Sequence, residues 1–333
     1  MKDLNLKLFS TYKTELMGFS ILGVMLAHII TIGNYSSNRV VWALEVFSLL
    51  TFTPCFLFLS GIGMYNSFSR NNDIKHFYIK RLKRVYVPFL FIAFPYFFFF
   101  DIVVNEHLLE CVEHITTLSF WIDGNYSGMW YISVILALYL IYPFMHKIIF
   151  RKKKSVILTS VYAISIYVLS RISIELFFPN YYKNLSIGLT KLPMFIVGVV
   201  CMHYINKDKK WFSIKHFFIL ASLWVIFRLI SKHFVYLHPE YVLCKYFITI
   251  SFVTLCLHSI KGINFFSWFD KLLNFFGKYS LEMYIIHLLL FYTLDYFYGV
   301  EYSERRLIIF AVMISIIVSP FINRIISKLT SYF

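Results

Sequence analysis

The sequence has few charged residues: Asp, Glu, Lys and Arg make up 15% of its 333 positions, and only 17 residues are acidic. A soluble domain carries about a quarter of its residues as charges. Hydrophobic residues account for 59% of the chain, with 38 Phe and 25 Tyr. The composition therefore excludes a soluble globular protein and indicates a chain whose surface lies mostly in lipid.

Cysteines are also few, and their spacing is irregular. An odd number of cysteines, scattered and mostly inside apolar runs, predicts neither a disulfide framework nor a metal-ligand cluster. The five are Cys55, Cys111, Cys201, Cys244 and Cys256. The first apolar run lacks a small-residue cleavage site, so we expect a retained helix and not a removed signal.

Apolar runs long enough to cross a bilayer, which takes about 20 helical residues, recur along the whole chain. We expect an all-α, polytopic membrane protein with about ten transmembrane helices. No stretch between the runs could fold as a separate soluble domain, so residues 1–333 should form a single transmembrane domain. The predicted spans are 15–33, 41–65, 85–104, 130–149, 156–177, 187–205, 212–232, 241–260, 272–292 and 306–326.

Ten spans place both termini on one side of the membrane. Basic clusters, such as those within residues 70–84 and RKKK (151–154), fall on that side. The acidic segment 101–124, which has no Lys or Arg, falls on the other. The positive-inside rule therefore predicts cytoplasmic termini. The net charge of +15 is then mostly a topology signal, and we expect no nucleic-acid partner because no aromatic and basic module accompanies it.

Several ionisable residues lie inside the predicted spans. His28, in SILGVMLAHIITIG (20–33), lies roughly 20 Å along its helix from Glu15, which places it in the outer half of the bilayer. Such groups are costly in lipid unless they face a cavity or each other. We expect a shared polar chamber, open toward the outside, around His28, Glu282, His287, Arg171, Glu175 and Arg228, with Lys191 as a further candidate.

Each of these residues also has a structural interpretation. A single histidine can hydrogen-bond a neighbouring helix and fix its packing. Arg171 and Glu175 are four residues apart and could satisfy each other. Arg228 could extend its side chain to the membrane interface.

Six segments, in order along the chain, resemble motifs of the membrane acyltransferase 3 family. They are LMGFSILGVMLAH (16–28), FLFLSGIGMYNSF (56–68), FYIKRLKRVYVPF (77–89), MWYISVILALYLIYP (129–143), TKLPMFIVG (190–198) and GKYSLEMYIIH (277–287). Each motif alone is weak, but six in family order form a strong signal.

The resemblance implies a multi-pass enzyme of the bacterial inner membrane. Such an enzyme transfers an acyl group, usually acetyl from cytoplasmic acetyl-CoA, to a hydroxyl of a cell-surface or lipid-linked polysaccharide. The expected partners are membrane lipid, the glycan acceptor and acyl-CoA, which is a substrate, so no permanently bound cofactor is expected. We expect the form without an extracytoplasmic esterase-like domain.

The resemblance also implies roles for individual residues. The family's catalytic histidine corresponds to His28, which acts as general base or forms a transient acyl-histidine. Arg81 and Arg84 correspond to an Arg-x-x-Arg pair that can grip coenzyme A phosphates, although basic clusters beside spans are common. Glu282 and His287 match the last motif and could orient an imidazole or bind acceptor hydroxyls.

One position departs from the family pattern. Met17 stands eleven residues before His28, where the family commonly has arginine. Lys13, one turn earlier, can take its place, and Lys191 stands where the family often has an arginine before Leu-Pro. The departure predicts a rearranged donor site, a different donor or lost activity.

Two other functions fit the same features. A transporter or flippase for a lipid-linked sugar would also have many spans and polar groups within them, although we find no internal repeat of the kind transporters often show. A non-catalytic glycan-assembly partner would keep the fold and lose the chemistry.

Overall fold

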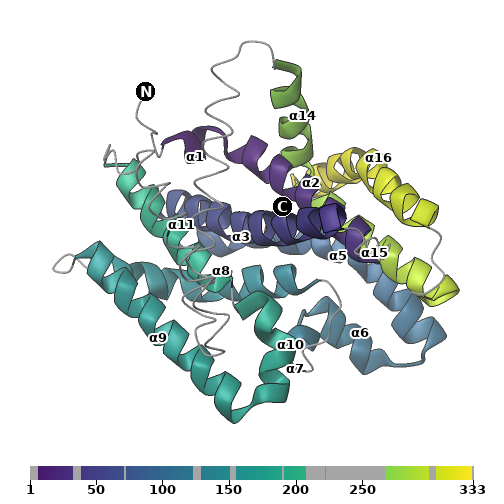
Figure 1. The fold of residues 1–333 in the computed structure, drawn as a ribbon, viewed down its shortest axis with the longest axis horizontal. Helices are drawn as coiled ribbons and strands as arrows, with labels where there is room; N and C mark the ends of the chain where they lie inside the picture. The colour runs from purple at the N-terminus through teal and green to yellow at the C-terminus, as the bar shows by residue number, and fades with distance from the viewer. Residues whose placement is uncertain are drawn as a thin grey trace.

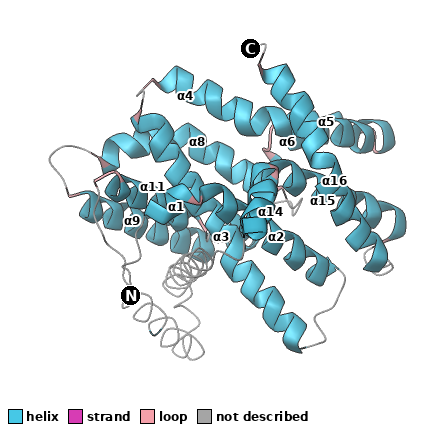
Figure 2. Ribbon diagram, turned by 90° about the horizontal axis from the view of Figure 1, so that it is seen from above, coloured by secondary structure: helices cyan, strands magenta, loops and turns pink. Residues whose placement is uncertain are grey.

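A computed structural model of the chain describes residues 7–32, 39–70, 73–122, 129–150, 155–189, 191–207, 222, 267–299 and 305–331. Apart from residue 222, the predicted spans 212–232 and 241–260 lie outside the described residues, and Arg228 lies there with them. Within the described ranges every regular element is a helix, as Figure 2 shows. The all-α prediction is therefore confirmed for this part of the chain.

The described part of the chain contains sixteen helical segments, of which two, η1 and η2, are π-helical. They are α1 (Lys7–Thr11), α2 (Lys13–Ile32), α3 (Arg39–Ser69), α4 (Ile74–Arg81), η1 (Leu82–Tyr86), α5 (Val87–Phe97), η2 (Phe98–Val104), α6 (Leu108–Ile115), α7 (Ser119–Ile122), α8 (Trp130–Ile149), α9 (Val156–Phe177), α10 (Pro179–Leu189), α11 (Leu192–Ile205), α14 (Ser267–Lys278), α15 (Ser280–Tyr298) and α16 (Arg305–Thr330).

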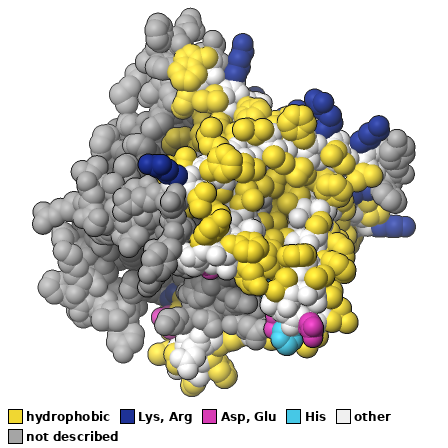
Figure 3. Space-filling model, turned by 90° about the vertical axis from the view of Figure 1, so that its right-hand side faces the viewer, with side chains coloured by type: hydrophobic (Ala, Val, Ile, Leu, Met, Phe, Trp, Pro, Cys, Tyr) yellow, Lys and Arg dark blue, Asp and Glu magenta, His cyan; other side chains and the backbone are white. Residues whose placement is uncertain are grey.

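Six helical segments of the described chain are long and apolar enough to cross a membrane. They are Lys13–Ile30, Ile74–Val104, Trp130–Ile149, Val156–Phe177, Leu185–Ile205 and Arg306–Thr330. Figure 3 shows the matching surface on one face, a continuous apolar field with most of the visible Lys and Arg at its upper and right-hand margins. The chain is therefore a multi-pass membrane protein, while the predicted total of ten spans is not confirmed.

Helices α2 and α3 lie in the middle of the molecule and separate two groups of helices (Figure 1). One group contains α8, α9, α10 and α11, and α11 packs along α3. The other contains α5, α6, α15 and α16, with α15 packed against α16, α5 and α2. This arrangement places residues from both halves of the sequence beside α2.

Two pairs of glycines allow neighbouring helices to touch backbone to backbone. A Cβ atom on Gly18 of α2 would lie 1.9 Å from the Leu273 carbonyl oxygen of α14. A Cβ atom on Gly61 of α3 would lie 2.2 Å from the Phe195 carbonyl oxygen of α11. Such distances leave no room for any side chain, which is the usual reason for small residues between membrane helices.

The long helix through residues 74–104 begins earlier than the predicted span 85–104, because its first turns are charged and do not read as apolar. Asp73 caps it, and its carboxylate accepts hydrogen bonds from the backbone N–H groups of Lys75 and His76. The turn η1 precedes Pro88, which has no N–H to donate to the carbonyl four residues earlier. A π-helical turn accommodates this loss, and such turns are frequent at functional sites.

The predicted span 272–292 is not one helix, which corrects the sequence-based boundary. It divides at Tyr279 into α14 and α15. Gly277, which lies at the crossing with α2, has a low helix propensity, and the Ser280 hydroxyl donates to its carbonyl at 3.0 Å. The break turns the first residues of α15 toward the space beside α2.

Candidate active site

A cavity of about 210 Å³ lies between α2, α3, the end of α4, η1, α8, α14, α15 and α16. Five residues singled out from the sequence line it: Lys13, His28, Arg81, Arg84 and Glu282. They come from positions spread over 270 residues of sequence, and the fold brings them to one space.

One end of the cavity, called the basic end below, is formed around Gly63. A Cβ atom on Gly63 would lie 2.2 Å from the Lys13 ammonium nitrogen, so this group packs directly on the glycine. Arg81 donates from Nη2 to the Gly63 carbonyl oxygen at 2.7 Å. The absence of a side chain at position 63 therefore lets two cations approach the same residue.

Arg81 is buried, with only 6% of its surface exposed, and several contacts fix its position. Its guanidinium carbon lies 5.6 Å from the centre of the Phe77 ring and 5.7 Å from that of Tyr139. Its buried Nε atom has no hydrogen-bond partner among the described residues. A buried polar atom of this kind is normally satisfied, and the Arg81 side chain also lines the cavity, where an anionic ligand could meet the guanidinium.

Positive charge exceeds negative charge at the cavity. Arg84 and Lys278 line it in addition to Lys13 and Arg81, whereas Glu282 is the carboxylate among the described lining residues. Within the described ranges the two ion pairs lie elsewhere, between His114 and Asp101 and between Arg171 and Glu175. Like charges brought together in a partly buried site repel each other unless an anion binds between them.

Glu282 lies in the first turn of α15 and is 3% exposed. Its Oε1 atom accepts a hydrogen bond from Asn323 Nδ2 at 2.6 Å, which ties α15 to α16. A buried carboxylate needs such partners to remain in an apolar setting. Asn323 also lines the cavity and was missed in the sequence, where an amide within an apolar span is the signal that could have indicated it.

His28 lies at the other end of the cavity. The 15 residues from Lys13 to His28 on α2 correspond to roughly 22 Å along a helix, and both residues line the same space. Met17, which replaces the arginine expected by resemblance, lines the cavity between them. The cavity is thus long, with charge at one end and an imidazole at the other.

A second histidine stands behind the first. The Nδ1 atom of His28 lies 2.9 Å from Nε2 of His287, and the two ring planes are inclined by 27° with their centres 5.2 Å apart. His287 is fully buried, and it is not among the residues that line the cavity. His28 therefore faces the cavity, and His287 contacts it from the protein side.

Aromatic and hydroxyl side chains form the wall between the two ends. The Ser60 and Tyr131 hydroxyl oxygens lie 3.1 Å apart, and Trp130 lines the same wall. The Tyr131 ring lies 5.7 Å from that of Tyr284, which in turn lies 6.0 Å from the His287 ring. The sequence motifs contain these residues, but no pattern alone assigned them to the site.

Three of the residues expected in the polar chamber lie away from this cavity. Arg171 Nη2 is 3.4 Å from Glu175 Oε2, and Arg171 also donates to the Tyr182 hydroxyl. Lys191 donates to the Ile187 carbonyl oxygen and lies 4.9 Å from the centre of the Trp130 ring, without lining the cavity itself. The chamber expected from membrane depth therefore does not include Arg171 and Glu175.

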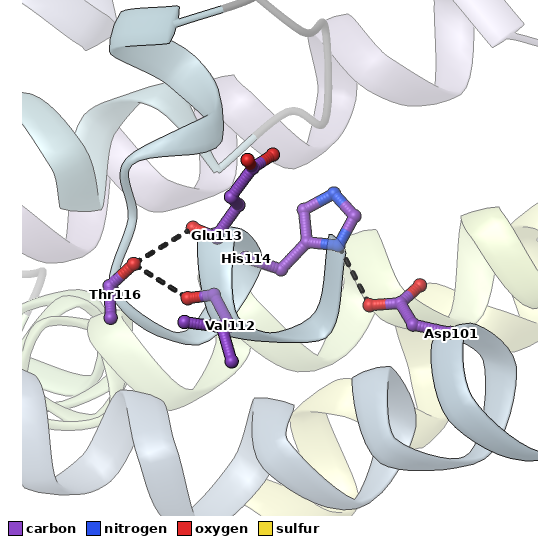
Figure 4. A network of polar contacts seen from close by, with 5 residues as sticks. All are labelled: Asp101, Val112, Glu113, His114 and Thr116. Carbon is purple, nitrogen blue, oxygen red and sulfur yellow. Dashed lines mark hydrogen bonds and ion pairs between the residues drawn. The ribbon is translucent and has the colours of Figure 1, made fainter. Parts of the chain in front are cut away.

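A separate polar cluster links η2 to α6 (Figure 4). His114 Nδ1 donates to the buried Asp101 carboxylate at 2.8 Å, and the imidazole stacks on Phe97 with ring centres 4.6 Å apart. The Thr116 hydroxyl lies 2.6 Å from the Val112 carbonyl oxygen and closes the end of α6. These contacts tie the short helix α6 to the long helix before it.

The fold and the cavity together define a class: a polytopic helical membrane protein with a long internal site that joins a cationic pocket to a histidine. A family model described as an acyltransferase domain matches residues 16–324. This match covers nearly the whole chain, and the protein belongs to the acyltransferase 3 family, as the six motifs predict. The family places it among membrane acyltransferases.

A search of curated proteins returned no match to this chain, and a search of solved structures returned none either.

Proposed function

We propose that this protein is an O-acyltransferase that moves acetyl from acetyl-CoA to a hydroxyl of a cell-surface or lipid-linked polysaccharide. The observation that carries the proposal is the cavity, which holds cations at one end and His28 at the other, roughly 22 Å away. An extended donor with phosphates at one end and a thioester at the other matches this arrangement.

The basic end would bind the phosphates of coenzyme A. Guanidinium groups hold phosphate oxygens through paired hydrogen bonds, and ammonium groups add point charge. Arg81 has an unpartnered buried donor, and Lys13 packs beside it on Gly63. In the bacterial inner membrane this end would face the cytoplasm, where acetyl-CoA is made, which agrees with the positive-inside reading of the loops.

His28 would act as the general base. A sugar hydroxyl is a weak nucleophile, and a positioned imidazole that removes its proton raises the rate by about 10²- to 10⁴-fold. The oxygen then attacks the thioester carbonyl carbon, the carbon–sulfur bond breaks, and coenzyme A leaves as a thiol after it receives the proton. The partly buried position of the ring, with Phe291 edge-on to it at 6.5 Å, would keep competing water away from the thioester.

The acceptor would bind at the wall formed by Trp130, Tyr131 and Ser60. Ligand sites commonly combine aromatic surfaces with a few placed polar groups, and these residues supply both near the histidine pair. Glu282, held by Asn323, offers a carboxylate that can accept hydrogen bonds from substrate hydroxyls or amides.

The test uses purified protein in liposomes with [¹⁴C]acetyl-CoA and a glycolipid extract from cells that lack the protein. We expect label in the glycan fraction, and mild alkali should release it because esters are alkali-labile and amides are not. Alkali-stable label would contradict transfer to oxygen. Movement of glycolipid across the bilayer without any gain of label would contradict the enzyme and support a transporter.

A further inference from the structure

The contact between His28 and His287 helps to determine which nitrogens of the two rings carry hydrogen. Their Nδ1 and Nε2 atoms are 2.9 Å apart, and either nitrogen could donate if the pair is considered alone. The neutral pair is the relevant form, because His28 can accept a proton only while it is neutral.

A second contact removes the ambiguity. The other nitrogen of His287, Nδ1, lies 2.6 Å from the Met283 carbonyl oxygen, one turn earlier on α15. A carbonyl oxygen only accepts, so Nδ1 of His287 must carry hydrogen. In a neutral imidazole the remaining nitrogen is then an acceptor, and Nε2 of His287 must receive its hydrogen bond from Nδ1–H of His28.

This order of donors fixes the protonation of the ring that lines the cavity. With hydrogen on Nδ1, His28 has a free lone pair on Nε2, the nitrogen that does not contact His287. We infer that His287 is a positioning residue: it holds His28 in the tautomer whose Nε2 can take the acceptor's proton. This inference rests on the proposed transferase function.

The proton path that follows is balanced. The acceptor O–H gives its proton to Nε2 of His28 while its oxygen bonds to the thioester carbon. The carbon–sulfur bond breaks, the sulfur takes the electron pair, and Nε2–H of His28 returns the proton to the thiolate. His287 keeps its own hydrogen on Nδ1 throughout, bonded to Met283.

Packing alone is a competing explanation for His287. Its ring lies edge-on to Phe291 at 5.4 Å and to Tyr284 at 6.0 Å, and an aromatic ring without nitrogen could make both contacts. Three substitutions separate packing from positioning. His287→Phe keeps an aromatic ring without nitrogen. His287→Asn places its amide where Nδ1 stood and does not reach His28. His287→Gln is longer and places its amide oxygen where Nε2 stood.

We expect His287→Phe and His287→Asn to lower kcat by about 10- to 100-fold, as is typical when the partner that orients a reactive imidazole is lost. The KM for acetyl-CoA should stay near the wild-type value, because the basic end is unchanged. His287→Gln should recover most of the loss, since its oxygen can accept from Nδ1–H of His28. A wild-type kcat in His287→Phe, or the same loss of kcat in His287→Gln as in His287→Phe, would overturn the inference.

The controls distinguish this inference from the function on which it rests. Each variant is checked for monodispersity in detergent and for saturable binding of [¹⁴C]acetyl-CoA. If wild-type protein transfers no label, the proposed function fails whatever the variants do. If the wild type transfers label, His28→Ala does not, and His287→Phe is fully active, then only the positioning role of His287 fails.

Discussion

Ionisable side chains in the outer parts of the helical bundle are paired, acidic with basic, whereas those described in the cavity are not. At Asp101–His114 and Arg171–Glu175, each acidic side chain has a basic side chain within 4 Å, and the contacts tie local elements together. In the cavity, Lys13 and Arg81 meet at one glycine without a carboxylate partner in the described chain, and His28 pairs with another histidine. Paired side chains stabilise the fold, whereas groups whose hydrogen-bonding or ion-pairing capacity is not used within the protein are available to a substrate.

The largest effect should come from His28→Ala. Loss of the base should lower kcat by about 10²- to 10⁴-fold, while the KM for acetyl-CoA and the yield of folded protein remain near wild type. The measurement is initial rate against donor concentration in proteoliposomes. If the variant is folded and fully active, His28 takes no part in the reaction. Its role would then be structural, like that of His114.

Arg81→Ala should act on the donor and not on the chemical step. A charge-assisted hydrogen bond to phosphate contributes about 1.5–3 kcal/mol, so the KM for acetyl-CoA should rise by about 10- to 150-fold. Lys75→Ala is the matched control, because this lysine is exposed on the same helix and does not line the cavity. Equal effects of the two substitutions would indicate a general surface-charge effect.

Gly63→Ala also tests donor binding at the basic end, but without removing a charge. The new methyl group would displace the flexible end of Lys13, so we expect a several-fold rise in KM with the fold intact. Gly61→Ala is the contrasting variant, because its methyl group would meet the Phe195 carbonyl oxygen, which is backbone and cannot move aside. That variant should be recovered in low yield, as judged by gel filtration in detergent. A folded Gly63→Ala variant with an unchanged KM for acetyl-CoA would contradict a contribution of Lys13 to donor binding.

Asp101→Ala tests the outer region. The Nδ1–H group of the half-buried His114 would lose its acceptor, which costs about 1–3 kcal/mol. Thermal unfolding in detergent should therefore occur at a lower temperature, while kcat and KM measured well below that temperature stay unchanged. A fall in kcat comparable to that of His28→Ala would show that the Asp101–His114 pair takes part in the reaction.

The smallest effect is expected at Arg171–Glu175. The Glu175 side chain is 45% exposed, and ion pairs at such sites contribute about 0–1 kcal/mol. The double variant Arg171→Gln with Glu175→Gln should keep wild-type kinetics and nearly the wild-type unfolding temperature. A change in acceptor KM would instead restore these residues to the polar chamber expected from the sequence.

The sequence was informative where periodicity and composition decide the structure. The predicted spans 130–149 and 156–177 match α8 and α9, because long apolar runs bounded by polar residues leave little choice. The break at Tyr279 was missed because the apolar run continues through it, and the close crossing of Gly277 with Gly18 beside it joins residues far apart in sequence. The early start of α4 was missed because its charged turns carry no apolar signal.

The same limit applies to the site. Residue spacing predicts depth along a helix, so it placed His28 and His287 at one level, where the structure joins them. Depth does not predict which helices are neighbours, and therefore Arg171 was grouped with His28 although it lies beside Tyr182 on another part of the bundle. Motif order supplied the missing lateral information for Arg81, Arg84 and Glu282, which the fold brings to one cavity.

The most direct test of the central claim is to locate the acyl group of the bound donor. An acyl-CoA with a small diazirine in its acyl chain is bound to the protein in liposomes, irradiated, and the labelled peptides are mapped by mass spectrometry. We expect labels on the cavity-lining parts of α2 and α3 near His28, such as Val24, Thr53 and Phe56, and protection by excess acetyl-CoA. Labels confined to α6 or to the exposed face of α9, unaffected by competitor, would contradict it.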